Sequence, residues 1–297
     1  MTRGLRGTLA ATVLCALMVL GACSPPRPDH PVIGAKNFTE QVILGELLAQ
    51  HIEATTGLKV ERRFYLAGSY IAHQALISGR IDAYVEYTGT ALTAILKQPV
   101  ERGALRARET VARLYREKYG VEATAPLGFE NTFAMVVRGD DAERLNLHRL
   151  SDVAGLAAPL RLGVGYEFQE RPDGLRGMSE RYGLKFAGTP RVMDLGLLYR
   201  ALNAKQVDIV AGNSTDGPIR AFGLVALEDD RHYFPPYEAV PLVREATLAR
   251  WPQIRTALNE LGGKVSAEEM RDMNNAVDGE HRDPAEVVKE FRARRGL

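Results

Sequence analysis

One short pattern occurs twice in this chain, and it constrains the fold more than any other feature. Residues 75–90 contain a helix end, a short apolar run with Asp82 near its start, and then a polar loop. Residues 201–217 repeat this order, with Asp208 standing 126 positions after Asp82 (from 82 to 208). Both apolar runs are short and β-prone, as expected for parallel strands that are buried on both faces.

A second pair of stretches shows the same offset. Residues 56–60 and residues 182–186 both contain Gly-Leu-Lys followed by an apolar residue. Gly57 and Gly183 are again 126 positions apart (from 57 to 183). A shared offset at two separated places indicates structural duplication, so we expect two similar lobes.

Strands and helices alternate along the chain, which predicts an α/β fold with mainly parallel sheets flanked by helices. The extended runs at 129–137 and 234–243 are expected to leave the first lobe and to return to it. Two such crossings form a hinge. The predicted domains are residues 32–132 plus 236–297 for one lobe and residues 133–235 for the other.

Polar and aromatic side chains gather just after the predicted strands, where open α/β sheets bind ligands. Aromatic faces attract quaternary ammonium groups, and amides and hydroxyls orient carboxylates. Packing, capping and turn formation compete with ligand contact, most evenly for Asn37, Thr90 and Phe133. The predicted ligand-binding residues are Asn37, Gln41, Tyr87, Thr90, Asn131, Phe133, Tyr166, Asn213, Thr215 and Tyr237.

The turn before the first long helix contains several polar residues. Asn37 together with Glu40, or Thr39 alone, is expected to cap that helix. Lys36 is expected to be a solvated turn residue, although it could also pair with an anionic group of a ligand. The strand of the first repeat is expected at 81–85, which places Tyr87 in a polar loop.

The N-terminus is typical of a targeting segment. Arg3 and Arg6 precede an apolar run that is too short for a membrane span. The run ends in Leu-Gly-Ala before Cys23, which resembles the lipobox of bacterial lipoproteins. We therefore predict a signal peptide at 1–22, lipidation of Cys23 and a tether at 23–31. A plain signal peptide with a chance cysteine is the alternative.

Several function classes find no support in the sequence. Charged residues make up 25% of the chain and the formal net charge is +1, which gives no sign of a nucleic-acid partner. The six histidines lack metal-ligand spacing, and no nucleotide-binding motif is present. We expect no enzymatic activity, no metal and no cofactor, and we expect a monomer that binds a small solute.

Four motifs closely resemble the substrate-binding proteins of glycine betaine/carnitine/choline ABC transporters. They are Gly34–Gln41, Glu86–Thr90, Ser214–Gly217 and Phe234–Tyr237. The resemblance implies a two-lobed periplasmic-binding-protein fold of type II that closes on its ligand. It also implies delivery to a membrane permease driven by a separate ATPase.

The resemblance further implies an aromatic cage around an ammonium group, with Tyr87 and Phe133 at cage positions. Asn213 and Glu238 stand where many members carry an aromatic residue, so the cage is thinner here. The implied location is the periplasm or the outer face of the cell membrane, with a lipid anchor. A receptor for another small amine, amino acid or related solute remains an alternative, as does a ligand sensor.

Overall fold

The computed structural model describes residues 28–297, and Pro31–Leu297 are built on two five-stranded sheets. The predicted signal peptide and the predicted lipidation site, Cys23, lie outside the described residues, as does most of the predicted tether. In the described part of the chain, no helix has both the length and the apolar character needed to cross a membrane.

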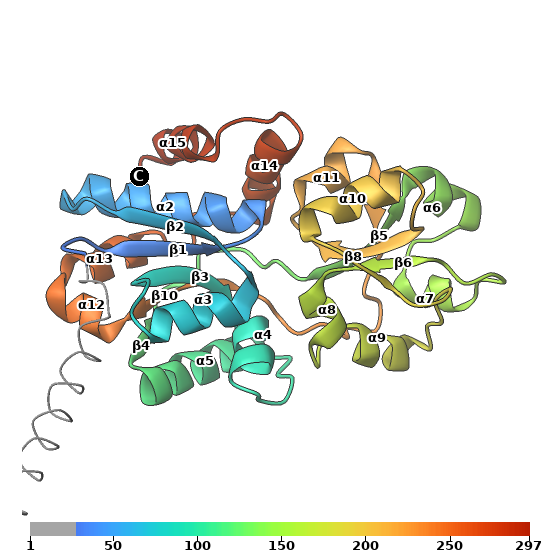
Figure 1. Ribbon diagram of the computed structural model, residues 1–297, viewed down its shortest axis with the longest axis horizontal. Helices are drawn as coiled ribbons and strands as arrows, with labels where there is room; N and C mark the ends of the chain where they lie inside the picture. Colours follow the sequence, from blue (N-terminus) through green and yellow to red (C-terminus); the bar gives the residue numbers. More distant parts are fainter. Residues whose placement is uncertain (1–27) are drawn as a thin grey trace, which may run out of the picture. The chain divides into compact units, whose positions relative to one another are not determined.

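The first sheet has the strand order β2-β1-β3-β10-β4, and we call it, with the helices packed on it, the first lobe (Figure 1). β1 is parallel to β2 and β3, whereas β10 runs antiparallel to β3 and β4. Its strands are β1 (Val32–Lys36), β2 (Glu61–Leu66), β3 (Ala83–Tyr87), β4 (Val121–Ala123) and β10 (Ala239–Arg244). Its helices are α2 (Thr39–Thr56), α3 (Gly68–Ile77), α4 (Thr88–Thr90) with a π-helical turn (Ala91–Ile95), α5 (Ala104–Tyr119), α12 (Glu245–Arg250), α13 (Gln253–Glu260), α14 (Ala267–Asp278) and α15 (Pro284–Arg295).

The second sheet has the order β7-β6-β8-β5-β9, and with its helices it forms the second lobe. β6 is parallel to β7 and β8, whereas β5 runs antiparallel to β8 and β9. Its strands are β5 (Phe133–Arg138), β6 (Leu162–Val164), β7 (Arg191–Val192), β8 (Ile209–Asn213) and β9 (Leu224–Ala226). Its helices are α6 (Gly139–Leu145), α7 (Leu150–Ala154), α8 (Tyr166–Glu170), α9 (Leu175–Tyr182), α10 (Leu195–Asn203) and α11 (Gly217–Ala221).

The two sheets repeat one topology, which confirms the predicted duplication. β1 lies between β2 and β3 in the first sheet, and β6 lies between β7 and β8 in the second. In each sheet one antiparallel strand comes next, β10 beside β3 and β5 beside β8. Asp82 accepts a hydrogen bond from the backbone N–H of Val32, and Asp208 accepts one from the N–H of Arg161. Each aspartate therefore ties the start of its strand to the neighbouring strand. The prediction of mainly parallel sheets is confirmed, with one antiparallel strand in each sheet's interior.

The strands of both lobes are buried on both faces, as their apolar sequences predict. In the first lobe, Ile33 and Val85 pack with α2 and the C-terminal helices α12–α15, while Val32 and Tyr84 pack with α3 and α5. In the second lobe, one face of the sheet packs with α6–α9 and the other with α10. This layering holds the ends of β3 and β8 in fixed positions.

Several local predictions need correction. β3 begins two residues later than expected and includes Tyr87, so this tyrosine ends a strand and does not lie in a loop. The N-cap residue of α2 is Phe38, and no side chain caps this helix. Asn37 accepts a hydrogen bond from the backbone N–H of Gly68, and Thr39 donates one to Asp278. The polar residues of this turn therefore bind neighbouring segments.

The two segments that connect the lobes lie side by side. Glu130 and Glu238 form an isolated antiparallel bridge, and the backbone N–H of Asn131 donates to the carbonyl of Tyr237 at 3.1 Å. The first segment leads into β5 and the second leads into β10. The exact lobe boundaries, at 132/133 and 235/236, stay a prediction.

Candidate ligand-binding site

A cavity of about 470 Å³ is lined by residues of both lobes. Its walls come from the β1–α2 turn, the start of α3, the ends of β3 and β8, the segments between the lobes, and helix α8. Eight of the ten predicted ligand-binding residues line it: Asn37, Tyr87, Thr90, Asn131, Phe133, Tyr166, Asn213 and Tyr237. The carboxyl ends of β3 and β8 therefore meet at one cavity, as expected for an α/β protein.

Tyr87, the last residue of β3, forms a deeply buried aromatic wall of the cavity. Its side chain is 4% exposed, and the ammonium of Lys36 lies 4.7 Å from the ring centroid. The phenol donates a hydrogen bond to Glu40 at 2.6 Å and accepts one from Gln41 at 3.2 Å. The orientation of the ring is therefore fixed at its hydroxyl, while the ring itself interacts with a cation.

A second group of aromatic rings belongs to the connecting segments and the second lobe. Phe133 contacts Phe168, Phe234 and Tyr237, with ring centroids 4.9–5.9 Å apart. The guanidinium of Arg171 lies 4.8 Å from the Phe133 centroid. Phe133 therefore combines the two alternatives that the sequence left open, because it packs against other rings and also faces the cavity.

Both cations of the cavity have a buried carboxylate partner. Lys36 pairs with Glu86 at 2.6 Å, and Arg171 pairs with Asp173 through two hydrogen bonds of 2.9 and 2.5 Å. Burial alone would raise the pKa of Asp173, but the charge of Arg171 outweighs it and holds this pKa below its usual value. The prediction that Lys36 is solvated is wrong: the residue is 3% exposed.

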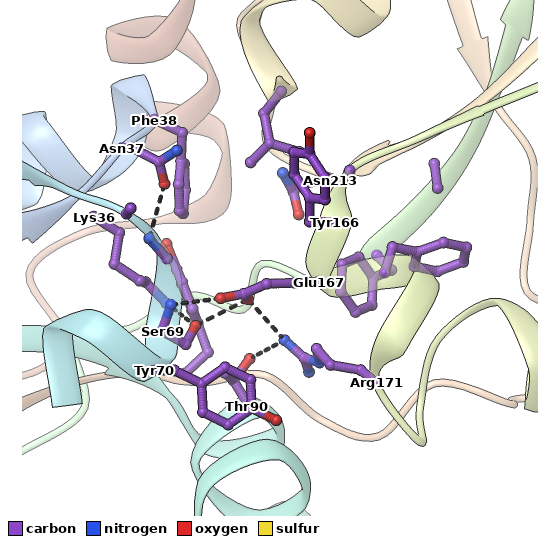
Figure 2. Close-up of a pocket in the computed structure, with 18 of the residues that line it drawn as sticks. Lys36, Asn37, Phe38, Ser69, Tyr70, Thr90, Tyr166, Glu167, Arg171 and Asn213 are labelled. Carbon is purple, nitrogen blue, oxygen red and sulfur yellow. Dashed lines mark hydrogen bonds and ion pairs between the residues drawn. The ribbon is translucent and has the colours of Figure 1, made fainter. Parts of the chain in front are cut away.

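Glu167 places a carboxylate across the cavity between the lobes. Its two oxygens accept hydrogen bonds from the backbone N–H and the hydroxyl of Ser69, at 2.5 and 3.0 Å, at the N-terminal end of α3 (Figure 2). The guanidinium of Arg171 lies 3.7 Å away and donates to the hydroxyl of Thr90 at 2.9 Å. Gly68 has a φ of +78°, which favours glycine, and a Cβ atom there would lie 2.5 Å from a carboxylate oxygen of Glu167 and would displace it. The site therefore contains donors arranged for a carboxylate.

Glu40 joins the aromatic wall to the second lobe. It is 1% exposed and accepts four hydrogen bonds, two on each oxygen: Tyr87 and Asn131 donate to one, and Thr215 and Asn274 to the other. Burial raises the pKa of Glu40, and the four donors oppose this effect. The carboxylate thus connects α2, β3, the first connecting segment, the loop after β8, and α14.

The remaining predicted residues occupy different surroundings. Gln41 and Thr215 do not line the cavity, and their side chains bind Tyr87 and Glu40 instead. Tyr166 is the first residue of α8 and is 71% exposed at the cavity. Sequence reasoning missed Glu167 and Arg171, whose spacing of one helical turn after a predicted strand was the available signal.

A second cavity of about 490 Å³ adjoins the first. The residues that line both cavities, and so form the wall between them, are Asn37, Phe38, Asp194, Leu195 and Asn213. On the far side, Asp216 accepts hydrogen bonds from the hydroxyl of Tyr199 and from the backbone N–H of Asn213. Burial raises the pKa of Asp216 to about 7, against the effect of these donors. Asn213 is thus positioned by a titratable neighbour.

These features define the class of protein: two similar α/β lobes, joined by two connecting segments, enclose a small, partly aromatic cavity. Comparison with known proteins gives the family. Residues 31–294 match the model of the substrate binding domain of the ABC-type glycine betaine transport system. This match covers most of the chain, and the protein belongs to this family of transport substrate-binding proteins.

Individual relatives agree with this assignment. The chain is 35% identical to a carnitine transport binding protein of Listeria monocytogenes, over 94% of this chain and 92% of the relative. It is 34% identical to a glycine-betaine-binding protein of Pseudomonas aeruginosa, over 87% and 86% of the two chains. A crystal structure described as a glycine betaine/carnitine/choline ABC transporter has a TM-score of 0.75 at 35% identity, covering 90% of this chain and 98% of that one.

Proposed function

We propose that this protein captures a small quaternary ammonium solute of the glycine betaine, choline or carnitine type between its two lobes. The observation that carries the proposal is the pairing of a buried, oriented aromatic wall with carboxylate-binding donors in one cavity. Tyr87 and Phe133 supply ring faces, and each already lies within 5 Å of a protein cation. Rings that attract an ammonium or guanidinium group also attract a quaternary ammonium.

The cavity also contains donors for the carboxylate end of such a solute. Ser69 and Arg171 contact the carboxylate of Glu167, and Thr90 accepts a hydrogen bond from the same guanidinium. A ligand with its own carboxylate would share these donors with Glu167, whereas choline would leave them to Glu167. The names of the relatives, which include carnitine and glycine betaine, support the same ligand class.

Calorimetric titration of the purified full-length protein with glycine betaine, choline and carnitine tests the proposal. We expect saturable binding of at least one of the three, and loss of most of the affinity in Tyr87→Ala. If none of the three binds while an amino acid or another small amine does, the protein is a receptor for a different solute and the quaternary ammonium proposal is wrong.

We further propose that the protein is a lipoprotein at the outer face of the cell membrane and delivers its solute to an ABC permease. The support is the lipobox-like sequence before Cys23 together with the family assignment. Cys23→Ser should prevent lipid labelling and release the protein from the membrane fraction. Uptake of labelled ligand by cells with and without the gene separates transport from ligand sensing.

Finally, we propose that residues 32–132 plus 236–297 and residues 133–235 move as two lobes about the connecting segments. The support is the pairing of the two connecting segments and the hydrogen bonds that Glu167 and Thr215 of the second lobe make with Ser69 and Glu40 of the first. Saturating ligand should reduce the radius of gyration in solution scattering, since receptors of this type close by hinge motion. An unchanged scattering profile would contradict hinge closure.

A further inference from the structure

The cavity has a second part that the proposed ammonium site leaves unused. Five residues line it without belonging to the buried polar end: Tyr70, Ile71, Tyr166, Met193 and Leu195, which we call the outer wall. Tyr70, Ile71 and Tyr166 are 43%, 50% and 71% exposed. Tyr87 and Tyr237, in contrast, are 4% and 2% exposed. The outer wall therefore lies at the mouth of the cavity.

The outer wall is built from both lobes. Tyr70 and Ile71 belong to α3 of the first lobe, and Tyr166 is the first residue of α8 in the second. Figure 2 shows Tyr70 and Tyr166 as they line the cavity with Glu167 and Arg171. A group that extends from the buried end toward solvent would pass between these side chains.

Large exposed apolar side chains are concentrated here. Eight such residues occur among residues 28–297, and three of them line this cavity. Two more, Tyr65 and Phe222, line the adjoining cavity. Contiguous exposed apolar surface on a soluble domain commonly marks a ligand groove or an interaction site. Continuity with the ligand cavity favours a ligand group as the occupant of the outer wall.

The chemistry of the outer wall fits an apolar group. Ile71 and Leu195 carry no hydrogen-bonding side-chain atoms, and the thioether of Met193 is only a weak acceptor. The hydroxyl of Tyr70 accepts a hydrogen bond from Lys97 at 2.9 Å. The volume of about 470 Å³ is in the range that holds drug-sized ligands, which have far more atoms than glycine betaine. Asp194, between Met193 and Leu195, also lines the cavity, but one oxygen of its carboxylate accepts a hydrogen bond from the backbone N–H of Gly196 at the start of α10. The wall therefore offers mainly burial and ring contact.

We propose that the outer wall is a subsite for an apolar arm, so that the preferred ligands are quaternary ammonium compounds carrying an unbranched chain of several carbons. This inference rests on the proposed function, because the ammonium head must occupy the buried end. From the ammonium head, the apolar arm extends between α3 and α8 and packs on Ile71 and Leu195. Apolar surface removed from water then adds to the affinity in proportion to chain length.

A homologous ligand series tests the proposal on the purified full-length protein. Glycine betaine, carnitine, and O-acetyl-, O-butyryl- and O-hexanoylcarnitine are titrated calorimetrically under one condition. Burial of half of each added methylene predicts about a twofold gain per methylene. The four methylenes between acetyl and hexanoyl should therefore lower Kd about fifteenfold. A Kd that is flat or rises along the acyl series overturns the subsite.

Variants identify the surface responsible. Ile71→Ser and Leu195→Ser should each reduce the dependence of Kd on chain length, because a hydroxyl replaces buried aliphatic surface. Leu105→Ser is the matched control, since Leu105 is 57% exposed on α5 and does not line the cavity. Its chain-length dependence should equal that of the parent. An equal reduction in Leu105→Ser would overturn the assignment to the outer wall.

The results separate this inference from the proposed function. Binding of glycine betaine or carnitine with no gain from the acyl chain rejects the outer wall and leaves the ammonium site intact. Binding that appears only with acyl chains supports the outer wall. Absence of binding by every member of the series rejects the outer wall, and if choline does not bind either, the proposed function is rejected as well.

Discussion

The loops after β3 and after β8 occupy equivalent places in the two lobes but present different chemistry. Each follows the third strand of its sheet, and their residues correspond at the offset of 126 positions (87 to 213 and 90 to 216). Tyr87 corresponds to Asn213, and Thr90 to Asp216. In the first lobe a ring is held by Glu40, whereas in the second an amide is held by Asp216.

The difference shows that two lobes with the same backbone topology contribute different side chains to one binding site. Both strands bring their last residue to the cavity, because the sheet topology is the same. The end of β3 supplies a ring face, while the end of β8 supplies a smaller polar wall next to a second cavity. An ammonium group would therefore be held more strongly from one side than from the other.

The two strand-start aspartates give the largest expected effect on folding. Asp82 is 2% exposed and accepts hydrogen bonds from Val32 and Thr247, whereas the side chain of Asp208 is 21% exposed. Asp82→Ala should lower the free energy of unfolding by about 3 kcal/mol and Asp208→Ala by about 1 kcal/mol, because buried donors lose their acceptor at position 82.

Urea unfolding of both variants and the parent measures this difference. Equal losses of stability would mean that the two lobes depend on their aspartates to the same degree. That result would contradict the argument from burial.

Substitutions of Tyr87 test which lobe holds the ammonium. Tyr87→Ala should weaken glycine betaine binding by about 2 kcal/mol, or some thirtyfold, because a desolvated cation–π contact is lost. Tyr87→Phe keeps the ring and should weaken binding much less. It should still lower the free energy of unfolding by about 1–2 kcal/mol, because Glu40 loses one of its four donors.

Titration calorimetry and urea unfolding on the same samples separate the two effects. A fall in affinity as large for Tyr87→Phe as for Tyr87→Ala would show that the hydroxyl, and not the ring face, determines binding.

Asp216 makes the second loop sensitive to pH, whereas Thr90 at the equivalent place cannot titrate. The pKa of Asp216 is raised to about 7 by burial. The folded chain therefore binds this proton more tightly than the unfolded chain, and stability falls as the pH rises from about 4 through 7. We expect a loss of about 2 kcal/mol between pH 5 and pH 8, because most of the raised pKa range of this buried carboxyl is titrated there.

Asp216→Asn should flatten this part of the pH profile of stability. Glu40 is a second buried carboxyl with a raised pKa and contributes a dependence of the same sign, which the variant should retain. A profile with the same slope in Asp216→Asn and the parent would assign the pH dependence to Glu40 and to other carboxyls.

The smallest expected effect comes from making the two loops alike. Asn213→Tyr places a ring opposite Tyr87 and should tighten glycine betaine binding by about 0.5–1 kcal/mol, discounted for imperfect geometry. It also removes the amide that donates to Asp216. Tighter binding supports the view that Asn213 thins an aromatic cage. If Asn213→Tyr instead abolishes binding of the solute that the parent protein binds, Asn213 forms a polar contact with a solute other than glycine betaine.

The sequence by itself determined the duplication and the type of fold. The offset between Asp82 and Asp208 is visible without coordinates, because the same strand start requires the same carboxylate to bind a neighbouring N–H. The capping box of Ser266 with Glu269 and the start of the last helix at Pro284 are equally local features of the sequence. Short-range hydrogen bonding and backbone preference are sufficient to predict such features.

Only the tertiary structure decided which polar residues meet. Lys36 belongs to a sequence typical of a solvated turn, yet β3 brings Glu86 to within 2.6 Å of it and buries both. Glu40 and Thr215 are separated by 175 positions, and Ser69 and Glu167 by 98 positions. Long-range pairs of this kind depend on how one lobe packs against the other. Local sequence therefore predicts the strands that reach the cavity, while tertiary packing selects the side chains that act there.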